Sequence, residues 1–356
     1  MGPLLFIMYT NDISLLKLNS KSWLFADDTT IALDGINMNE ILAKLQEDLT
    51  KIIEWLNNNR LLLNLKKSQI MHLPSTTHQK KLLHLPSTCK AHCNKDQETK
   101  KTMKDANDKN IKCRKPIDSI IFNGKKVFFV EHVKILGVTL DNQLKYDQHI
   151  NQVCKKVNSK TAMLKKSNSL FPHKFKTLLF KLLLMPHYDY CSSLFMKPTS
   201  QQNRERIINN FNKSVLRFLK INLYGLTTEQ QLIKLRNLKL KMLPIILRLF
   251  THFCLFFYSF SRIENIELSK RLIINQRAHR SLYSFPAHNG TDHYKNSFLY
   301  ISCHIFNYLN DKNNRLRDET KKFINNKSKL KEYLDKNIIE IFFDTKQYHT
   351  FNHTIP

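Results

Sequence analysis

Glycine is scarce in this chain, with 6 glycines among 356 residues. Together with many leucine, isoleucine, asparagine and lysine residues, this scarcity favours a largely helical protein whose strands are confined to short stretches. The length allows two or three domains, each with a core of its own.

Acidic residues are also in short supply. The chain has 29 Asp and Glu against 57 Lys and Arg, which gives a net charge of +28. A chain this basic is expected to bind polyanions, because neutralising a phosphate backbone with Lys and Arg releases counterions and gives salt-dependent binding that tolerates many sequences. An acidic membrane surface is the competing partner.

The cysteines do not form the pattern of a disulfide framework, because the seven residues are odd in number and widely scattered. The N-terminus also lacks the basic segment of a secretory signal. The chain is therefore expected in a reducing, intracellular compartment, the cytoplasm, the nucleus or both. Zinc is a minor alternative, since no pair has the C-x2-C spacing of zinc sites among the nearest candidates, Cys89, His92, Cys93 and Cys113.

No long apolar run is free of charge. The nearest approach is Met242 to Phe260, where Arg248 and His252 fall near the middle. A charge there costs about 2.5 to 3.5 kcal/mol on membrane insertion. The stretch therefore predicts a buried helix after Pro244, and no stable membrane span is expected.

A pair of adjacent carboxylates stands out among the few acidic residues. Phe25-Ala26-Asp27-Asp28 lies between two apolar stretches of β character, so a hairpin would carry both aspartates at its tip, held by a packed sheet underneath. Two neighbouring negative charges need a cation or a solvated turn to compensate them. A divalent metal site is the functional interpretation, and a solvated Asp-Asp turn is the alternative.

Three further blocks accompany this tetrapeptide in a fixed order: Gly2 to Ile13, Leu61 to Met71, and Val133 to Asp141. Together the four blocks resemble the reverse transcriptase of non-LTR (LINE-like, jockey-like) retrotransposons. In that family they correspond to the end of motif B, motif C (F/Y-A-D-D), motif D (L-N-x-x-K-[ST]) and motif E (L-G-V-x-[LIF]-D). Each block alone is weak, but the set in register is specific.

The resemblance implies an RNA-directed DNA polymerase that extends a DNA primer on an RNA template by two-metal nucleotidyl transfer. It implies Asp27 and Asp28 as catalytic metal ligands for Mg²⁺ or Mn²⁺. Nucleotide or phosphate binding would fall to Phe25, Ala26 and Lys67. The primer grip would be Leu136, Gly137 and Val138.

Parts of the polymerase are not found in this sequence. The family's motif A aspartate, its fingers and the Gln-Gly that opens motif B have no counterpart, because one residue precedes the Gly2 block. The chain is therefore expected to be an N-terminally truncated piece that is inactive alone, with the missing N-terminal half as a candidate partner. A catalytically dead nucleic-acid-binding remnant and a basic membrane-surface protein are the alternatives, and an upstream endonuclease domain is left open.

The expected fold class is α+β: a partial polymerase palm, made of a β-hairpin with packed helices, followed by a mainly helical thumb and C-terminal region. The expected segments are 1–72 for the palm, 73–115 for an inserted flexible basic loop, 116–145 for motif E, 146–225 for the thumb, and 226–356 for a helical region without assigned chemistry.

Local patterns fill in these segments. In the palm, apolar residues from Ile41 to Leu56 have helical spacing, and the polar side of that helix is predicted to carry Lys44, Gln46, Glu47, Asp48 and Lys51. Asn123-Gly124 predicts a hairpin, and Ile135 to Leu140 predicts one further strand. In the thumb, Lys155, Lys156 and Lys160 are expected to contact the nucleic-acid backbone, with a solvated lysine face as the alternative.

Overall fold

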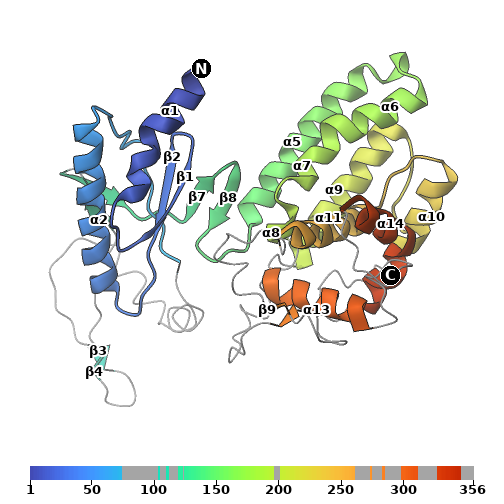
Figure 1. The fold of residues 1–356 in the computed structure, drawn as a ribbon. Helices are drawn as coiled ribbons and strands as arrows, with labels where there is room; N and C mark the ends of the chain where they lie inside the picture. Colours follow the sequence, from blue (N-terminus) through green and yellow to red (C-terminus); the bar gives the residue numbers. More distant parts are fainter. Residues whose placement is uncertain are drawn as a thin grey trace. The chain divides into compact units, whose positions relative to one another are not determined.

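The structure is a computed structural model that describes residues 1–73, 103–104, 110–111, 119–122, 124–195, 201–260, 273–274, 283–284, 298–311 and 327–345. In these ranges the protein is α+β and mostly helical, and its strands form short two-stranded sheets (Figure 1). The chain divides into two compact units, Met1–Val133 and Lys134–Pro356. The boundary falls inside the segment 116–145 that the sequence analysis treated as one domain.

The first unit begins with an apolar helix, as the sequence predicted. Helix α1 (Gly2–Thr10) has proline in its first turn, where a missing N–H costs nothing, and a 3-10 turn, η1 (Asn11–Leu15), continues it. The Tyr9 hydroxyl donates a hydrogen bond to the Asn59 carbonyl. None of the residues of α1 is buried, although the helix is apolar all round. A helix of that composition is normally covered by other elements.

Helix α2 (Met38–Asn58) supplies most of the first unit's core. The Asn37 side chain caps it by accepting a hydrogen bond from the Asn39 N–H. On the inner face, Leu49 packs with Ile120 and Phe122 of strand β5 (Ser119–Phe122). Strand β5 pairs with β6 (Lys125–Phe128) so that Phe122 opposes Lys125, and Gly124, just before β6, has a φ of +72°. The predicted Asn-Gly hairpin is confirmed.

One predicted surface residue of α2 is instead buried. Asp48 is fully enclosed and accepts hydrogen bonds from the backbone N–H groups of Asn19 (2.8 Å) and Ser20 (2.7 Å), and from the Asn19 side-chain amide (3.0 Å). Burial alone would raise the pKa of Asp48, but the hydrogen bonds from Ser20 and Asn19 outweigh it and lower the pKa. The carboxylate therefore ties the chain entering strand β1 (Lys21–Phe25) to α2.

Asp48→Asn is expected to destabilise the first unit by about 1 to 3 kcal/mol, because an amide cannot accept all of these hydrogen bonds. Since the folded pKa is depressed, the carboxylate's contribution is complete above its unfolded pKa of about 3.9 and is lost as pH falls through the lower folded pKa. The variant should therefore lack this acid-sensitive part of stability. Urea unfolding at several pH values measures it.

Tryptophan fluorescence reports on the first unit alone, because the chain's 2 tryptophans, Trp23 and Trp55, both lie there. Glu47→Gln is the matched control, since Glu47 is exposed and accepts one hydrogen bond from Asn19 at 3.2 Å. Equal losses in Asp48→Asn and Glu47→Gln would contradict the assignment.

The second unit is a helical assembly with one large core. Strand β7 (His132–Ile135), which spans the boundary, pairs with β8 (Val138–Asp141). The helices that follow are α5 (Asp147–Lys166), η2 (Asn168–Leu170), α6 (His173–Leu179), the π-helical turn η3 (Phe180–Leu184), α7 (Met185–Asp189), α8 (Ser192–Phe195), α9 (Gln201–Leu219), α10 (Thr228–Asn237), α11 (Ile245–Phe260), α13 (Phe298–Asp311) and α14 (Lys327–Asp344). The predicted helical character of this part of the chain is confirmed.

Helix α11 is the buried helix that the sequence predicted after Pro244. Its apolar side chains, among them Phe250 and Phe253, are enclosed in the core of the second unit. Its charge near the middle is neutralised, because Arg248 donates to both oxygens of Asp189, Nε at 2.7 Å and Nη2 at 2.6 Å. Within the described ranges, every helix falls short of the length or apolar character needed to cross a bilayer.

Short strand pairs also occur as β3 (Met103–Lys104) with β4 (Asn110–Ile111), and as β9 (Ile273–Ile274) with β10 (Tyr283–Ser284). The rest of the predicted loop from residue 74 to 115 lies outside the described residues. So do the minor zinc candidates Cys89, His92, Cys93 and Cys113.

Candidate nucleic-acid and metal site

The Asp-Asp pair lies at the tip of a hairpin, as predicted. Strand β1 (Lys21–Phe25) pairs with β2 (Asp28–Ala32) so that Phe25 opposes Asp28, which leaves Ala26 and Asp27 as a two-residue loop. Ala26 adopts a left-handed backbone with φ of +52°, which such tight loops require. Both aspartates are exposed. The loop therefore presents two neighbouring carboxylates to solvent.

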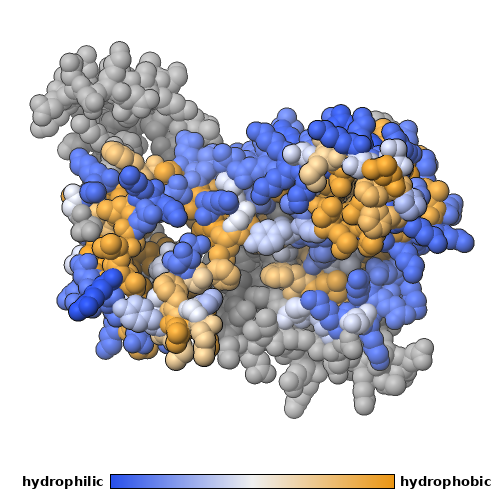
Figure 2. All heavy atoms as spheres, turned by 90° about the horizontal axis from the view of Figure 1, so that it is seen from above, coloured by the Kyte–Doolittle hydropathy of each residue, from blue (hydrophilic) through white to orange (hydrophobic). Residues whose placement is uncertain are grey.

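The packed sheet expected beneath this tip is not found among the described residues. The sheet has two strands, and the side chains of β1 are exposed, with Trp23 at 53% and Phe25 at 63%. The prediction failed because alternation of apolar residues reveals a face that can be buried but does not reveal what covers it. Figure 2 shows apolar side chains at the surface of the molecule.

The carboxylates at the tip are the right type of ligand for Mg²⁺ or Mn²⁺, but there are too few of them to hold two ions. Carboxylate oxygens are the ligands that these hard cations prefer. Two-metal nucleotidyl transfer, however, needs enough carboxylates to hold two ions about 3.5 to 4 Å apart. In the described part of the chain, no group of three or more His, Cys, Asp or Glu residues is placed to hold a metal. Asp27 and Asp28 thus provide part of such a site.

Motif D lies in a turn at the end of the first unit's core. The Lys67 side chain is exposed, and its backbone N–H donates to the Asn64 carbonyl at 3.0 Å. Three residues later, Ile70 forms a parallel bridge to Phe129, next to β6, and accepts a hydrogen bond from the Val130 N–H at 2.9 Å. The turn is therefore anchored at its C-terminal end, while the lysine is available to a phosphate.

Motif E is a hairpin and not the single strand that the sequence predicted. Leu136 and Gly137 form the two-residue loop between β7 and β8, with φ values of +46° and +85°. Positive φ at both positions is typical of type I′ turns, which favour glycine at the second one. The Tyr190 hydroxyl donates a hydrogen bond to the Leu136 carbonyl. The strand prediction overlooked this turn because Leu136 occupies the first left-handed position, where Asn or Gly is usual.

The three primer-grip candidates have different environments. Leu136 is exposed at the turn. A Cβ on Gly137 would lie 3.5 Å from the Tyr190 ring, so this backbone is closely covered on that side. Val138 is 4% exposed and belongs to the core of the second unit. A contact between this motif and a primer would therefore use the turn and its backbone, and not the Val138 side chain.

Asp141, the last residue of motif E, has a structural role that the sequence analysis missed. Its buried carboxylate accepts hydrogen bonds from the backbone N–H groups of Gln143 (3.0 Å), Lys145 (2.9 Å) and Tyr146 (2.5 Å). These bonds close the loop that leads into α5. Aspartate followed closely by a helix start is the signal that could have indicated it.

The lysines that were predicted to contact a nucleic-acid backbone lie on the outer side of α5. Lys155 and Lys156 are exposed and Lys160 is half-buried, whereas Val153 and Val157 face the core. His187 of α7 lies near them: burial lowers the pKa of His187, and the positive charges of Lys160 and Lys156 lower it further. No periodic signal in the sequence links His187 to these lysines.

Comparisons with models of known protein families, with curated proteins and with solved structures find no match to this chain. The motifs and the geometry within each of the two units are therefore the evidence that bears on function.

Proposed function

We propose that this chain is the motif B to thumb portion of a reverse transcriptase of the non-LTR type, which extends a DNA primer on an RNA template with Mg²⁺ or Mn²⁺. The observation that carries the proposal is the β1–β2 hairpin, whose two-residue loop presents Asp27 and Asp28 side by side at an exposed tip. The order of the surrounding motifs and the net charge of +28 support it. An intracellular location, in the cytoplasm or nucleus, is part of the proposal.

The same proposal holds that the chain is inactive alone. Two carboxylates do not complete a two-metal site, so the proposal places a further aspartate, which motif A supplies in the family, outside the described residues. The exposed apolar residues of α1 and β1 support a polypeptide partner, because isolated two-stranded hairpins and uncovered apolar helices are marginal in water. The N-terminal half of the polymerase is the partner we propose.

Salt-dependent binding of an RNA–DNA duplex tests the nucleic-acid part of the proposal. The triple change of Lys155, Lys156 and Lys160 to Gln is expected to weaken duplex binding about 10- to 100-fold at low salt. It should also make the negative slope of log K against log salt shallower by about 2 to 3, because each lost phosphate contact reduces the magnitude of the slope by about 0.9. Fluorescence anisotropy over a range of salt concentrations measures both quantities.

The matched control changes the exposed Lys234, Lys239 and Lys241 to Gln, which removes the same charge elsewhere in the second unit. It is expected to keep the slope of the unmodified chain. Equal slopes for the two triple variants would show that α5 does not contact the duplex.

A nucleic-acid-binding protein without catalysis is the second candidate, favoured by the absence of a third metal ligand from the described residues. Duplex binding is expected of both candidates and does not distinguish them. Metal-dependent DNA synthesis in the presence of the N-terminal partner is expected of the polymerase alone. The membrane-surface alternative relied on Met242 to Phe260, but most apolar side chains of α11, Phe250 and Phe253 among them, are buried, and, of its described side chains, Phe256 is the large apolar one that is exposed.

A further inference from the structure

Two C-terminal helices of the second unit border a half-open cavity that the chemistry above does not use. It lies between α11 and α14 and has a volume of ≈ 440 Å³. This is within the range of about 300 to 1,000 Å³ that is usual for small-molecule sites. Its lining combines charged, hydroxyl and apolar side chains: Leu243, Arg248, Thr251, His252, Leu255, Lys327, Ser328, Lys331 and Asp335.

Positive charge predominates around the cavity. Burial lowers the pKa of His252 and Asp189 opposes this shift, but the charges of Arg248, Lys331 and Lys327 lower the pKa further, which shows that these cations lie close to the imidazole. Arg248 is already paired with Asp189. Lys327 and Lys331 form no ion pair with any described residue. They are therefore available to an anion.

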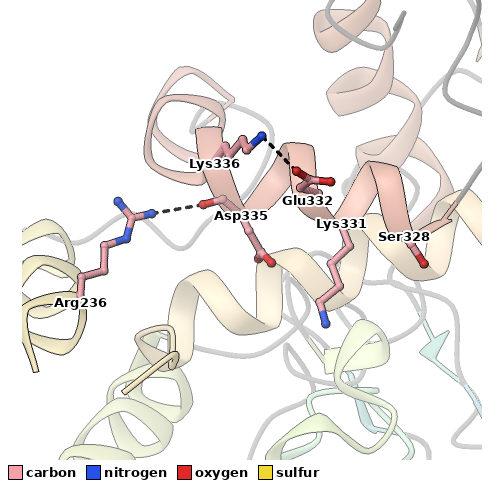
Figure 3. Close-up of a pocket in the computed structure, with 6 residues that line it drawn as sticks. All are labelled: Arg236, Ser328, Lys331, Glu332, Asp335 and Lys336. Carbon is pink, nitrogen blue, oxygen red and sulfur yellow. Dashed lines mark hydrogen bonds and ion pairs between the residues drawn. The ribbon is translucent and has the colours of Figure 1, made fainter. Parts of the chain in front are cut away.

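A second hollow of ≈ 540 Å³ adjoins the first, because the two share Ser328, Lys331 and Asp335 (Figure 3). In it, Lys336 is paired with Glu332 at 3.0 Å. Arg236 donates to the backbone carbonyl of Asp335 at 3.2 Å and so does not neutralise its carboxylate. The Asp335 carboxylate forms no ion pair with any described residue and lines both hollows together with Lys331.

We propose that this cavity binds a ribonucleotide, either free or as a unit of an RNA strand. Lys327 and Lys331 would hold the phosphate, since ammonium groups form charge-assisted hydrogen bonds with phosphate oxygens. The Asp335 carboxylate would accept hydrogen bonds from ribose hydroxyls, as acidic residues do in nucleotide sites. Leu243, Leu255 and the His252 ring would cover the base. The proposal gives residues 226–356 a role that does not depend on polymerase activity.

Isothermal titration of the full chain with AMP, adenosine and inorganic phosphate, without metal or primer, tests this site. AMP is expected to bind saturably and more tightly than either adenosine or phosphate. The double variant K327Q/K331Q should weaken AMP binding about tenfold or more, because two charge-assisted contacts are lost. D335N should weaken AMP binding but leave phosphate binding unchanged, because phosphate has no ribose.

K329Q is the control, since Lys329 is exposed on the same helix but lines neither hollow. RNA that displaces AMP would identify a strand as the source of the nucleotide, and RNA that leaves AMP bound would identify a free nucleotide; both results support the site. The proposal is overturned if AMP does not bind saturably or if phosphate binds as tightly as AMP. It is also overturned if K329Q weakens AMP binding as much as the double variant does. Displacement of AMP by anionic phospholipid vesicles, but not by RNA, would overturn it in favour of a membrane site.

Discussion

Replacement of Phe211 by alanine is expected to lower the free energy of unfolding of the second unit by about 3 to 5 kcal/mol. Phe211 lies in α9 and has no solvent exposure. Removing its ring deletes buried apolar surface and leaves a cavity that the surrounding helices fill only in part. This is the largest stability loss that we expect from a single substitution in the chain.

The size of the effect follows from the contacts of the ring. Phe211 makes edge-to-face contacts with Phe180 of η3 and with Tyr188 of α7, in each case with ring centroids 6.0 Å apart. The Tyr188 hydroxyl donates to the Asn210 side-chain oxygen at 2.6 Å, and burial raises the pKa of Tyr188, so it remains a neutral donor. The ring thus links α9 to the consecutive segments η3 and α7, which precede it in the sequence.

Leu216→Ala provides the matched control, because Leu216 lies in the same helix but is 37% exposed. It should change stability by about 0.5 kcal/mol. Thermal and urea unfolding followed by circular dichroism measure the helical second unit, and tryptophan fluorescence follows the first unit in the same samples. A Phe211→Ala loss no larger than that of Leu216→Ala would contradict the packing described here.

Periodicity and turn chemistry in the sequence predicted the local elements well. The helices around Ile41 to Leu56 and after Pro244, and the Asn123-Gly124 hairpin, all form where expected. Each depends on residues close together in the sequence, such as an apolar stripe or a glycine at positive φ. Local signals of this kind do not require knowledge of the partner element.

The turn at Leu136 was missed for a local reason, but two other predictions failed because they depended on residues far away in the sequence. Asp48 was assigned to the polar side of α2, yet it is buried because the backbone N–H groups of Asn19 and Ser20 reach it. The sheet expected under Asp27 and Asp28 is a two-stranded hairpin in the described residues. The periodicity of apolar residues in a segment does not reveal a distant hydrogen-bond partner, nor does it reveal whether another element covers the segment.

The candidate site was predictable to a similar extent. The tetrapeptide identified the hairpin tip, whereas contact between the lysines of α5 and a nucleic-acid backbone stays a prediction. The cavity between α11 and α14 was not predicted, because Lys331 is far in sequence from Arg248 and His252 and becomes their neighbour only in the folded unit. A cluster assembled from distant segments has no motif to detect.

Asp27→Asn is expected to abolish DNA synthesis in the assembly that the proposed function requires. The chain alone should incorporate no nucleotide, whereas a mixture with an N-terminal polypeptide of the same polymerase family, carrying its motif A aspartate, should extend a primer in the presence of Mg²⁺. In that mixture, Asp27→Asn should reduce incorporation about 10³-fold, because a lost metal ligand removes several kcal/mol of transition-state stabilisation. Primer extension with labelled nucleotide measures it.

Asp34→Asn is the matched control, because Asp34 is an exposed carboxylate shortly after β2 and is not part of the motif. It should leave synthesis unchanged, and both variants should bind the duplex as the unmodified chain does, since α5 is intact. Synthesis by the chain alone would refute the claim that its metal site is incomplete. Duplex binding without synthesis in any mixture would favour the nucleic-acid-binding alternative, because the Asp-Asp hairpin would then be a solvated turn on a protein that holds nucleic acid through its lysines.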